Sequence, residues 1–129
     1  MNVSTSVNEG DSVLIVVTEL KLKGVLAWLK FLPHAVRCKI QAERAEGNLA
    51  ALVSNHGLMI QRTLTAWDSK EDMQRYVRSG AHLKAMRAAP ELSTREGSKT
   101  LHFEAEEVPS WEVAIRRLEK DGVGYSPEE

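Results

Sequence analysis

The chain has 129 residues, of which 43% are hydrophobic and 27% are charged, a composition typical of one globular domain with a buried core. Seventeen Lys and Arg residues balance eighteen Asp and Glu residues, so we expect neither a nucleic-acid partner nor a membrane partner. The longest aliphatic run, 13–17, is too short to cross a bilayer, and residues 1–11 do not resemble a signal peptide, which predicts a cytoplasmic protein.

We expect one domain over residues 12–122, flanked by flexible segments at 1–11 and 123–129. Cys38 is the only cysteine, so it cannot form a disulfide within the chain. It lies among apolar residues of a predicted helix, and we interpret it as a buried, inert thiol.

Residues 12–22, SVLIVVTELKL, are rich in β-branched side chains and predict a strand that is covered on both faces. An amphipathic helix follows, with an apolar stripe at steps of three and four residues that we expect to face the core. The stripe consists of Val25, Leu29, Leu32, Val36 and Ile40, widened by Trp28, Phe31, Ala35 and Cys38. Pro33 predicts a short opening turn and a main helix from Pro33 to about Ala45, ended by Gly47.

Two strands, within 48–54 and 58–67, are predicted as an antiparallel hairpin, because Asn55 and Gly57 between them tolerate a tight turn. Alternation along 58–67 gives one aliphatic face and one mixed face. The aliphatic face holds Leu58, Ile60, Arg62, Leu64 and Ala66, and the mixed face holds Met59, Gln61, Thr63, Thr65 and Trp67. Arg62 on the aliphatic face indicates an edge position, an ion pair or a different register.

A split helix is predicted after the hairpin. Asp68 and Ser69 can both cap its first half. Ser79 and Gly80 interrupt the pattern, and Pro90 is expected to end the second half.

The last third of the chain predicts a turn, a strand and a helix. The segment STREGSK, 93–99, is typical of a turn, and KTLHFEAEEV, 99–108, alternates as a half-buried strand does. Start and stop signals at Pro109 and Gly122 predict a final helix.

This order of elements predicts an α+β fold: a ferredoxin-like βαββαβ antiparallel sheet with both long connections on one face, and an added C-terminal helix. The mixed face, with Met59 and Trp67, then requires a cover. A second copy of the sheet is the expected cover, which predicts a homodimer.

The segment TLTAWDSKEDMQRYVRSGAHLKAM, 63–86, resembles the dimeric α/β-barrel superfamily, in particular the antibiotic-biosynthesis-monooxygenase-like proteins. In those proteins a strand ends in Trp, a Ser-Lys/Glu-Glu/Asp turn follows, and the next helix is split. The resemblance implies a barrel shared by a homodimer, with a cavity for a small hydrophobic or aromatic molecule. Members include cofactor-free oxygenases, haem-degrading enzymes and proteins of unknown role.

Three residues of the mixed face are candidate substrate-binding residues. Trp67 at the end of the strand could stack on an aromatic substrate, or it could fill the joint between strand and helix. The hydroxyls of Thr63 and Thr65 could orient a phenol or quinone oxygen, or they could be ordinary strand residues.

His82 and His102 are the candidate catalytic residues. His82 opens the second half of the split helix, where a neutral imidazole could accept a proton. His102 is expected on the same class of face as Trp67, with Glu104 two residues later as a further candidate for the substrate site. Both histidines could equally be ordinary surface residues. His34 and His56 are weaker candidates, and the four histidines have no metal-ligand spacing, so no metal is predicted.

The haem-degrading relatives use an Asn in the first strand, a Trp in the first half of the split helix and a His in its second half. By register from Trp67, the last two positions are Tyr76 and Met86 here, and the first strand has no Asn. We therefore predict no cofactor, with haem held by His82 as the alternative, and we include Tyr76 in the substrate site.

The leading hypothesis is a homodimeric monooxygenase-like protein that oxidises a small aromatic molecule without a cofactor. The alternatives are a non-catalytic ligand-binding dimer and a haem-handling protein.

Overall fold

The computed structural model describes residues 12–124. Its elements, in chain order, are β1 (Val13–Leu22), α1 (Val25–Arg44), β2 (Asn48–His56), β3 (Ile60–Trp67), α2 (Lys70–Val77), α3 (Gly80–Leu92), β4 (Ser93–Ala105), α4 (Trp111–Asp121) and β5 (Val123–Gly124). The strands form one antiparallel sheet in the order β2-β3-β1-β4-β5, which confirms the predicted ferredoxin-like α+β fold. Of the expected flexible ends, 1–11 and 123–129, residues 1–11 and 125–129 lie outside the described residues.

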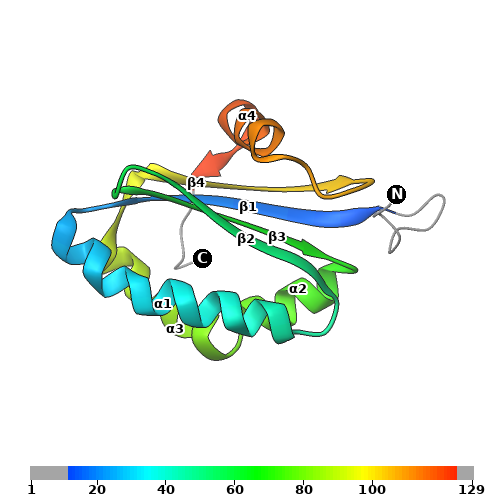
Figure 1. Ribbon diagram of the computed structural model, residues 1–129, viewed down its shortest axis with the longest axis horizontal. Coiled ribbons are helices and arrows are strands. Elements are labelled where there is room, and N and C mark those ends of the chain that lie inside the picture. Colours follow the sequence, from blue (N-terminus) through cyan, green and yellow to red (C-terminus); the bar gives the residue numbers. More distant parts are fainter. Residues whose placement is uncertain (1–11, 125–129) are drawn as a thin grey trace.

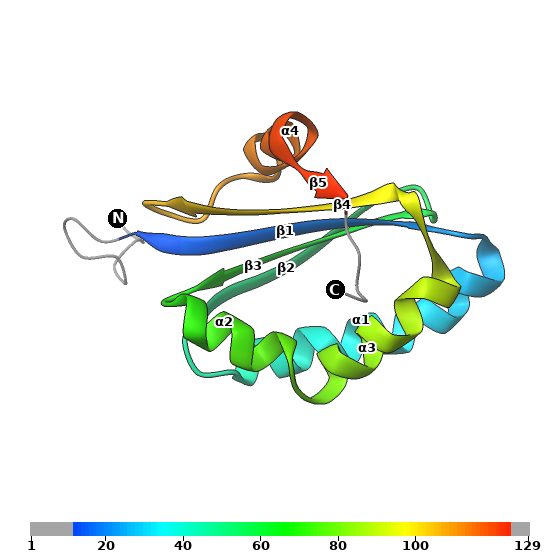
Figure 2. The same ribbon diagram turned by 180° about the vertical axis from the view of Figure 1, so that it is seen from behind.

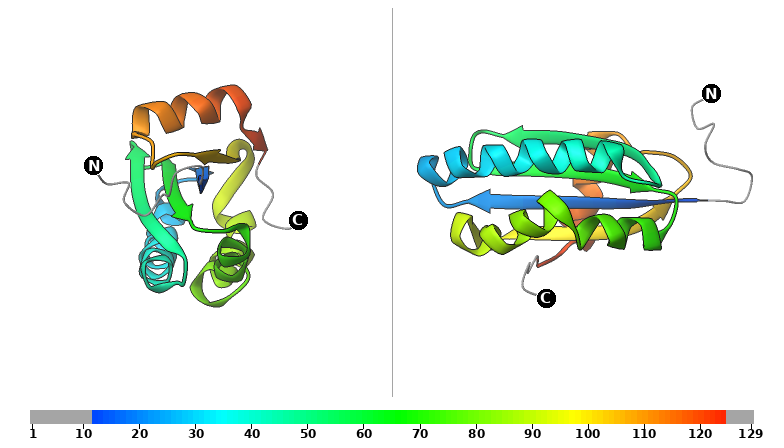
Figure 3. Two further views of the ribbon diagram at one scale, coloured as in Figure 1. Left: turned by 90° about the vertical axis from the view of Figure 1, so that its right-hand side faces the viewer. Right: turned by 90° about the horizontal axis from the view of Figure 1, so that it is seen from below.

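The molecule has three layers (Figures 1 and 2). Helices α1, α2 and α3 lie on one face of the sheet, as predicted for the two long connections, and α4 crosses the opposite face. Within the helical layer α1 lies on the β2 side and α3 on the β4 side (Figure 3). None of the described helices is both long and apolar enough to span a membrane.

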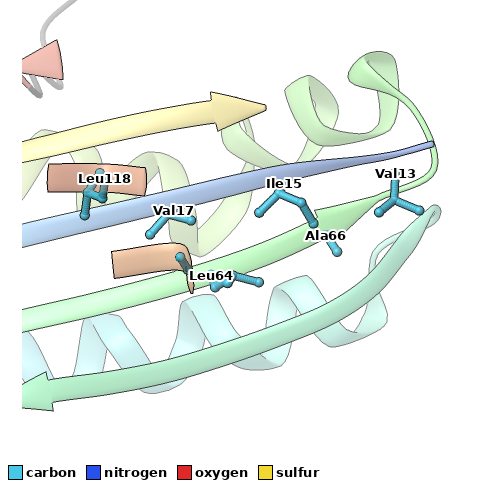
Figure 4. Close-up of a cluster of buried hydrophobic side chains, with 7 residues drawn as sticks. Val13, Ile15, Val17, Leu64, Ala66 and Leu118 are labelled. Atoms are coloured by element: carbon cyan, nitrogen blue, oxygen red, sulfur yellow. The ribbon is translucent and has the colours of Figure 1, made fainter. Parts of the chain in front are cut away.

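Strand β1 separates two cores because its side chains alternate between the faces. Val13, Ile15 and Val17 pack with Leu64 and Ala66 of β3 against α4 (Figure 4). On the opposite face a second core is built from both the sheet and the helical layer. It consists of Trp67, Ala42, Met73 and Tyr76, with Leu14, Val16, Ala45, Ala51 and Val77 packed around them.

The prediction that a second copy of the sheet covers the mixed face is wrong. The face of Thr63, Thr65 and Trp67 lies beneath α1, α2 and α3, whereas the aliphatic face is the one that α4 closes. The helices supply bulky partners such as Met73 and Tyr76, so the small threonine side chains suit that layer. No second copy is needed to bury Trp67.

The predicted inner stripe of α1 is wrong for its main row and right for part of its widening. Val25, Leu29, Leu32, Val36 and Ile40 are exposed. Phe31, Ala35 and Cys38, together with Ala42, line the cavity beneath the helix. Helix α1 is apolar on two sides, and periodicity alone does not say which side is buried. Pro33 does not break the helix. A proline has no N–H, so the carbonyl of Leu29, four residues earlier, loses its helical partner. Both residues are exposed, so water can bind that carbonyl instead.

Three boundaries in the last third of the chain differ from expectation. Helix α3 continues through Pro90 to Leu92, and β4 begins at Ser93, so the predicted turn 93–99 is part of a strand. A bulge explains the turn-like sequence: the ladder with β1 is irregular here, and Ser98 Oγ accepts from the Lys21 N–H and donates to the Thr94 carbonyl. The two-residue β5 lies in a segment predicted to be flexible.

Arg62 makes an ion pair, one of the three predicted alternatives. Its Nε donates to Glu19 Oε1 over 2.8 Å, and the two residues are directly opposite each other on β3 and β1. Both side chains are largely buried, so the pair satisfies charges that the aliphatic face could not otherwise tolerate.

Replacing Leu118 tests whether α4 closes the second face of the sheet. Leu118 is fully buried against β1 and β3, so Leu118→Ala should lower the free energy of unfolding by about 2–5 kcal/mol, measured by urea denaturation. Leu26→Ala, at a residue that is 65% exposed, is the matched control and should change it by less than about 1 kcal/mol. Equal effects would show that α4 does not pack on the sheet.

Candidate functional site

A cavity of about 120 Å³ lies between the sheet and the helices α1, α2 and α3. Most of its walls are apolar side chains from β1, α1, α2 and α3. They include Val16, Leu20, Phe31, Ala35, Met73, Val77, Ala85, Met86 and Ala89. The predicted site residues Thr63, Thr65, Tyr76 and His82 all line it, so the fold brings these four together.

The floor of the cavity carries threonine hydroxyls from the two central strands. Thr63 and Thr65 of β3 lie directly opposite Thr18 and Val16 of β1. The Thr100 hydroxyl donates to the Val17 carbonyl, so its single proton is used there. The hydroxyl oxygens of Thr18 and Thr100 are 3.1 Å apart. Because the Thr100 proton is already used, Thr18 must be the donor in this contact. Its oxygen keeps acceptor capacity for a polar group of a bound molecule.

His82 presents a neutral imidazole to the cavity. Its Nδ1 lies 3.1 Å from the Val77 carbonyl, and because a carbonyl only accepts, Nδ1 carries the proton. The second nitrogen, Nε2, is therefore the basic one. Burial lowers the pKa of His82, and the hydrogen bond to Val77 opposes this shift. The imidazole is thus uncharged at neutral pH and can accept a proton.

Gln41 of α1 fixes the position of His82. Its carboxamide nitrogen donates to the carbonyls of Tyr76 and Ser79, over 3.2 and 3.1 Å, and its oxygen accepts from the His82 backbone N–H over 2.8 Å. One side chain therefore satisfies backbone groups at the break between α2 and α3. Gly80 permits that break because its φ is +56° and a Cβ there would lie 3.2 Å from the Gln41 carboxamide.

Trp67, Tyr76 and His82 form a row of rings. The Trp67 and Tyr76 ring centres are 5.0 Å apart, and those of Tyr76 and His82 are 4.8 Å apart. Trp67 is fully buried and is not among the residues that line the cavity, so it supports the wall from behind through Tyr76. Its Nε1 is the only fully buried side-chain nitrogen or oxygen without a partner in the described part of the chain.

Cys38 lines the same cavity, and burial raises its pKa to about 11. The thiol therefore stays protonated at neutral pH, in agreement with its interpretation as inert. The Tyr76 hydroxyl donates to the Cys38 carbonyl over 3.2 Å, which ties α2 to α1.

The structure does not bring His102 and Glu104 to this cavity. Both side chains are exposed on β4 and absent from its lining, and the Glu104 carboxylate accepts from the Ser12 hydroxyl. His34, which the sequence indicated only as a weaker candidate, and Thr18, which it did not indicate, also line the cavity. The alternation of β1 could have identified Thr18, but only after the mixed face was assigned to the helical layer.

The described residues contain no group of three or more His, Cys, Asp or Glu side chains that could hold a metal ion. Among residues 12–124, the histidines that line the cavity are His34 and His82. The chemistry available from the chain itself is hydrogen bonding by hydroxyls and proton acceptance by imidazole.

No protein-family model and no curated protein matches the chain. Solved structures do match. SnoaB from Streptomyces nogalater, a cofactor-independent oxygenase, matches with a TM-score of 0.58 at 14% identity, over 75% of this chain and 96% of SnoaB. A Nitrosomonas europaea protein named for antibiotic biosynthesis monooxygenases matches with a TM-score of 0.64 at 12% identity, over 72% and 89% of the two chains.

A third match is Rv0793 from Mycobacterium tuberculosis, with a TM-score of 0.63 at 11% identity, over 78% of this chain and 99% of that one. The resemblance inferred from residues 63–86 is therefore confirmed at the level of the fold: the chain has the architecture of the antibiotic-biosynthesis-monooxygenase-like proteins. At these sequence identities the structural similarity shows the fold alone, and the activity has to be inferred from the site itself.

Replacing Gln41 tests its role in positioning His82. Gln41→Leu removes the carboxamide and leaves the His82 N–H and the two carbonyls without their partner. We expect the free energy of unfolding to fall by about 1–3 kcal/mol and the pKa of His82, followed by NMR, to rise toward its ordinary value as the ring becomes hydrated. The control, Gln74→Leu on α2, should leave that pKa unchanged. An unchanged His82 pKa in Gln41→Leu would contradict the role.

The lowered pKa of His82 also predicts how stability depends on pH. Unfolding restores the ordinary value of about 6.5, so between the folded and unfolded pKa the unfolded chain binds more protons. The contribution is fully present above about pH 7, and the free energy of unfolding falls as the pH decreases through about 6.5. Urea titrations of His82→Asn should show a weaker dependence, while His56→Asn, at the exposed end of β2, should match the wild type. A wild-type slope retained in His82→Asn would refute the assignment.

Proposed function

We propose that the chain binds a small, single-ring aromatic molecule in the cavity and oxidises it with molecular oxygen, without a cofactor, with His82 as the general base. The observation that carries the proposal is the combination of an apolar cavity, threonine hydroxyls on its floor and the neutral His82 imidazole in its wall. The fold shared with SnoaB, a cofactor-independent oxygenase, supports the class of reaction.

The volume of the cavity supports a single-ring substrate. About 120 Å³ is close to the roughly 150 Å³ apolar cavity that holds a benzene molecule in an engineered protein. A fused polycyclic molecule requires the helices to move away from the sheet. We therefore propose an electron-rich phenol or hydroquinone as the substrate class.

In the proposed reaction the chain supplies a base, orientation and a dry site. His82 Nε2 accepts the phenolic proton, and the hydroxyls of Thr63 and Thr65 hold the resulting oxyanion or the second ring oxygen. The electron-rich ring then reduces molecular oxygen. One oxygen atom enters the ring as a quinone carbonyl, the other leaves as water, and the ring loses two hydrogens, so that atoms and electrons balance.

The site assignments follow the cavity. Thr63, Thr65 and Tyr76 are proposed as substrate-contacting residues and His82 as the catalytic residue, because each lines the cavity. Trp67 is proposed to act through Tyr76, on which it packs. We do not assign His102 or Glu104 to the reaction, since neither reaches the cavity.

Haem does not fit this cavity. The macrocycle is several times larger than a single ring, and the wall that carries His82 is held close to α1 by Gln41. Tyr76 and Met86 also occupy the two positions where the haem-degrading relatives carry Trp and His.

A binding protein without catalysis is the second candidate function. It is favoured by the small number of polar groups: the Cys38 thiol is inert, and the Tyr76 hydroxyl is already bonded to the Cys38 carbonyl. Binding of a phenol without oxygen consumption would support it.

Oxygen uptake by the full-length chain with a panel of phenols and hydroquinones tests the proposal. His82→Asn should lower the turnover rate by about 100-fold or more, since general base catalysis contributes roughly 10²–10⁴. The Asn side chain can still donate to the Val77 carbonyl, so the fold should persist. His56→Asn, at the exposed end of β2 and outside the cavity lining, is the control and should retain the wild-type rate.

The outcomes separate the candidates. Turnover that survives in His82→Asn refutes the base assignment. Phenol binding that calorimetry detects without any turnover supports the binding function and refutes the proposed oxidation. If no phenol is bound or turned over, both proposed functions are refuted.

A further inference from the structure

A groove separate from the cavity lies between the C-terminal part of α1 and helix α2. The two helices run side by side there (Figures 1 and 3), and the groove has a volume of about 540 Å³. This volume falls within the roughly 300–1,000 Å³ of sites that bind small molecules. The α1 wall contributes Arg37, Ile40, Gln41 and Arg44, and the α2 wall contributes Asp72 and Arg75.

Gln41 and Tyr76 separate the groove from the cavity. The Gln41 carboxamide donates to the carbonyls of Tyr76 and Ser79, and the Tyr76 hydroxyl donates to the Cys38 carbonyl. Tyr76 lines both the groove and the cavity, whereas Gln41 lines the groove and not the cavity. These bonds hold α1 and α2 together, so the groove has walls that the fold itself fixes.

Three arginines line the groove and outnumber its acidic side chains. The acidic residues are Glu46 and Asp72, and both lie beside Arg75. Arg75 Nη1 is 2.8 Å from Asp72 Oδ1 and 4.0 Å from Glu46 Oε1. In the part of the chain that the structure describes, Arg37 and Arg44 form no ion pair. The groove therefore holds two guanidinium groups whose charge is not compensated.

The two acidic residues are not placed to neutralise these guanidinium groups. The Asp72 carboxylate packs on Gly47, where a Cβ would collide with it. It also lies in the first turn of α2, where the helix dipole favours a negative charge. The Glu46 side chain is 86% exposed, and an ion pair made by so exposed a carboxylate is weak.

Arg37 and Arg44 lie on the same side of α1, seven residues or about 10 Å apart along the helix axis. An arginine in the last turn of a helix complements the helix dipole, which explains Arg44 but not Arg37, two turns earlier. Ile40 lies between them and is 42% exposed. The α1 wall therefore presents two planar cations on either side of an apolar side chain.

We propose that the groove binds a small organic dianion, whose phosphate or two carboxylates are held by Arg37 and Arg44 and whose apolar part packs on Ile40. A guanidinium group binds phosphate or carboxylate through two parallel N–H···O bonds. Two uncompensated positive charges match a double negative charge. The inference does not rest on the proposed oxidation, because neither His82 nor the threonines of the cavity line the groove.

Calorimetric titration of the full-length chain with phenyl phosphate and with phthalate, at constant ionic strength, tests the proposal. Saturable binding is expected, and the probe that binds more tightly identifies the anionic group. The double variant Arg37→Gln with Arg44→Gln should weaken binding about tenfold or more, because hydrogen bonds between charged groups are lost. Both arginines are exposed, so the circular dichroism spectrum should not change.

Arg116→Gln is the matched control, since Arg116 is an exposed arginine on α4, and it should retain the wild-type affinity. Inorganic phosphate, which has no apolar part, should bind several-fold more weakly than phenyl phosphate. Equal binding of the two overturns the assignment to an organic anion. The absence of saturable binding by either organic probe overturns the proposal, as does binding that the double variant leaves unchanged.

NMR spectroscopy locates the bound probe. Titration with phenyl phosphate should shift the Nε–H signals of Arg37 and Arg44 and leave the methyl signals of Thr63 and Met86, which line the cavity, in place. Shifts of those methyl signals without shifts of the arginines place the probe in the cavity and overturn the proposal. Phenol serves as the probe of the cavity: if it does not bind while phenyl phosphate does, the groove is supported and the proposed function fails separately.

Discussion

The structure depends on one strand, β1, whose two faces must both be kept from water. It lies in the middle of the sheet, and its side chains alternate between a core closed by α4 and a core closed by the other helices. Neither layer can be removed without exposing aliphatic side chains of this strand. The helical layer does not pack flush on the sheet, however: a cavity of about 120 Å³ remains between them, lined on the sheet side by Thr18, Thr63 and Thr65 among aliphatic residues.

The order of elements and the sheet could be predicted because periodicity, glycine and proline positions report directly on local structure. The Ser69 cap is an example: its hydroxyl accepts from the Asp72 N–H, as the sequence predicts. The sequence could not predict which face of β3 and which side of α1 are buried against each other. Alternation along β3 divides its side chains into two sets, yet nothing local says which set meets α1, and α1 itself has two apolar sides. Choosing between them requires contacts between residues far apart in the chain, such as Ile15 with Leu118.

The candidate site was predicted in part for the same reason. Thr63, Thr65 and His82 were found from their positions at a strand and at a helix break, and the fold brings them to one cavity. Trp67 has the position expected of a substrate contact but is fully buried, because Tyr76 nine residues later packs over it. Gln41 gave no signal in the sequence. Its function as a link between α1 and the helix break depends on three backbone groups that only the folded chain assembles.

Helix α1 connects the cavity wall with the helix break that carries His82. Its inner side contributes Phe31 and Cys38 to the cavity, and its Gln41 side chain binds the backbone of Tyr76, Ser79 and His82. The Tyr76 hydroxyl donates to the Cys38 carbonyl, so α2 is also tied to α1. The proposed oxidation without a cofactor depends on a fixed orientation of base and substrate. The bonds from Gln41 hold the backbone of the proposed base, and a mobile helix break would lose that orientation.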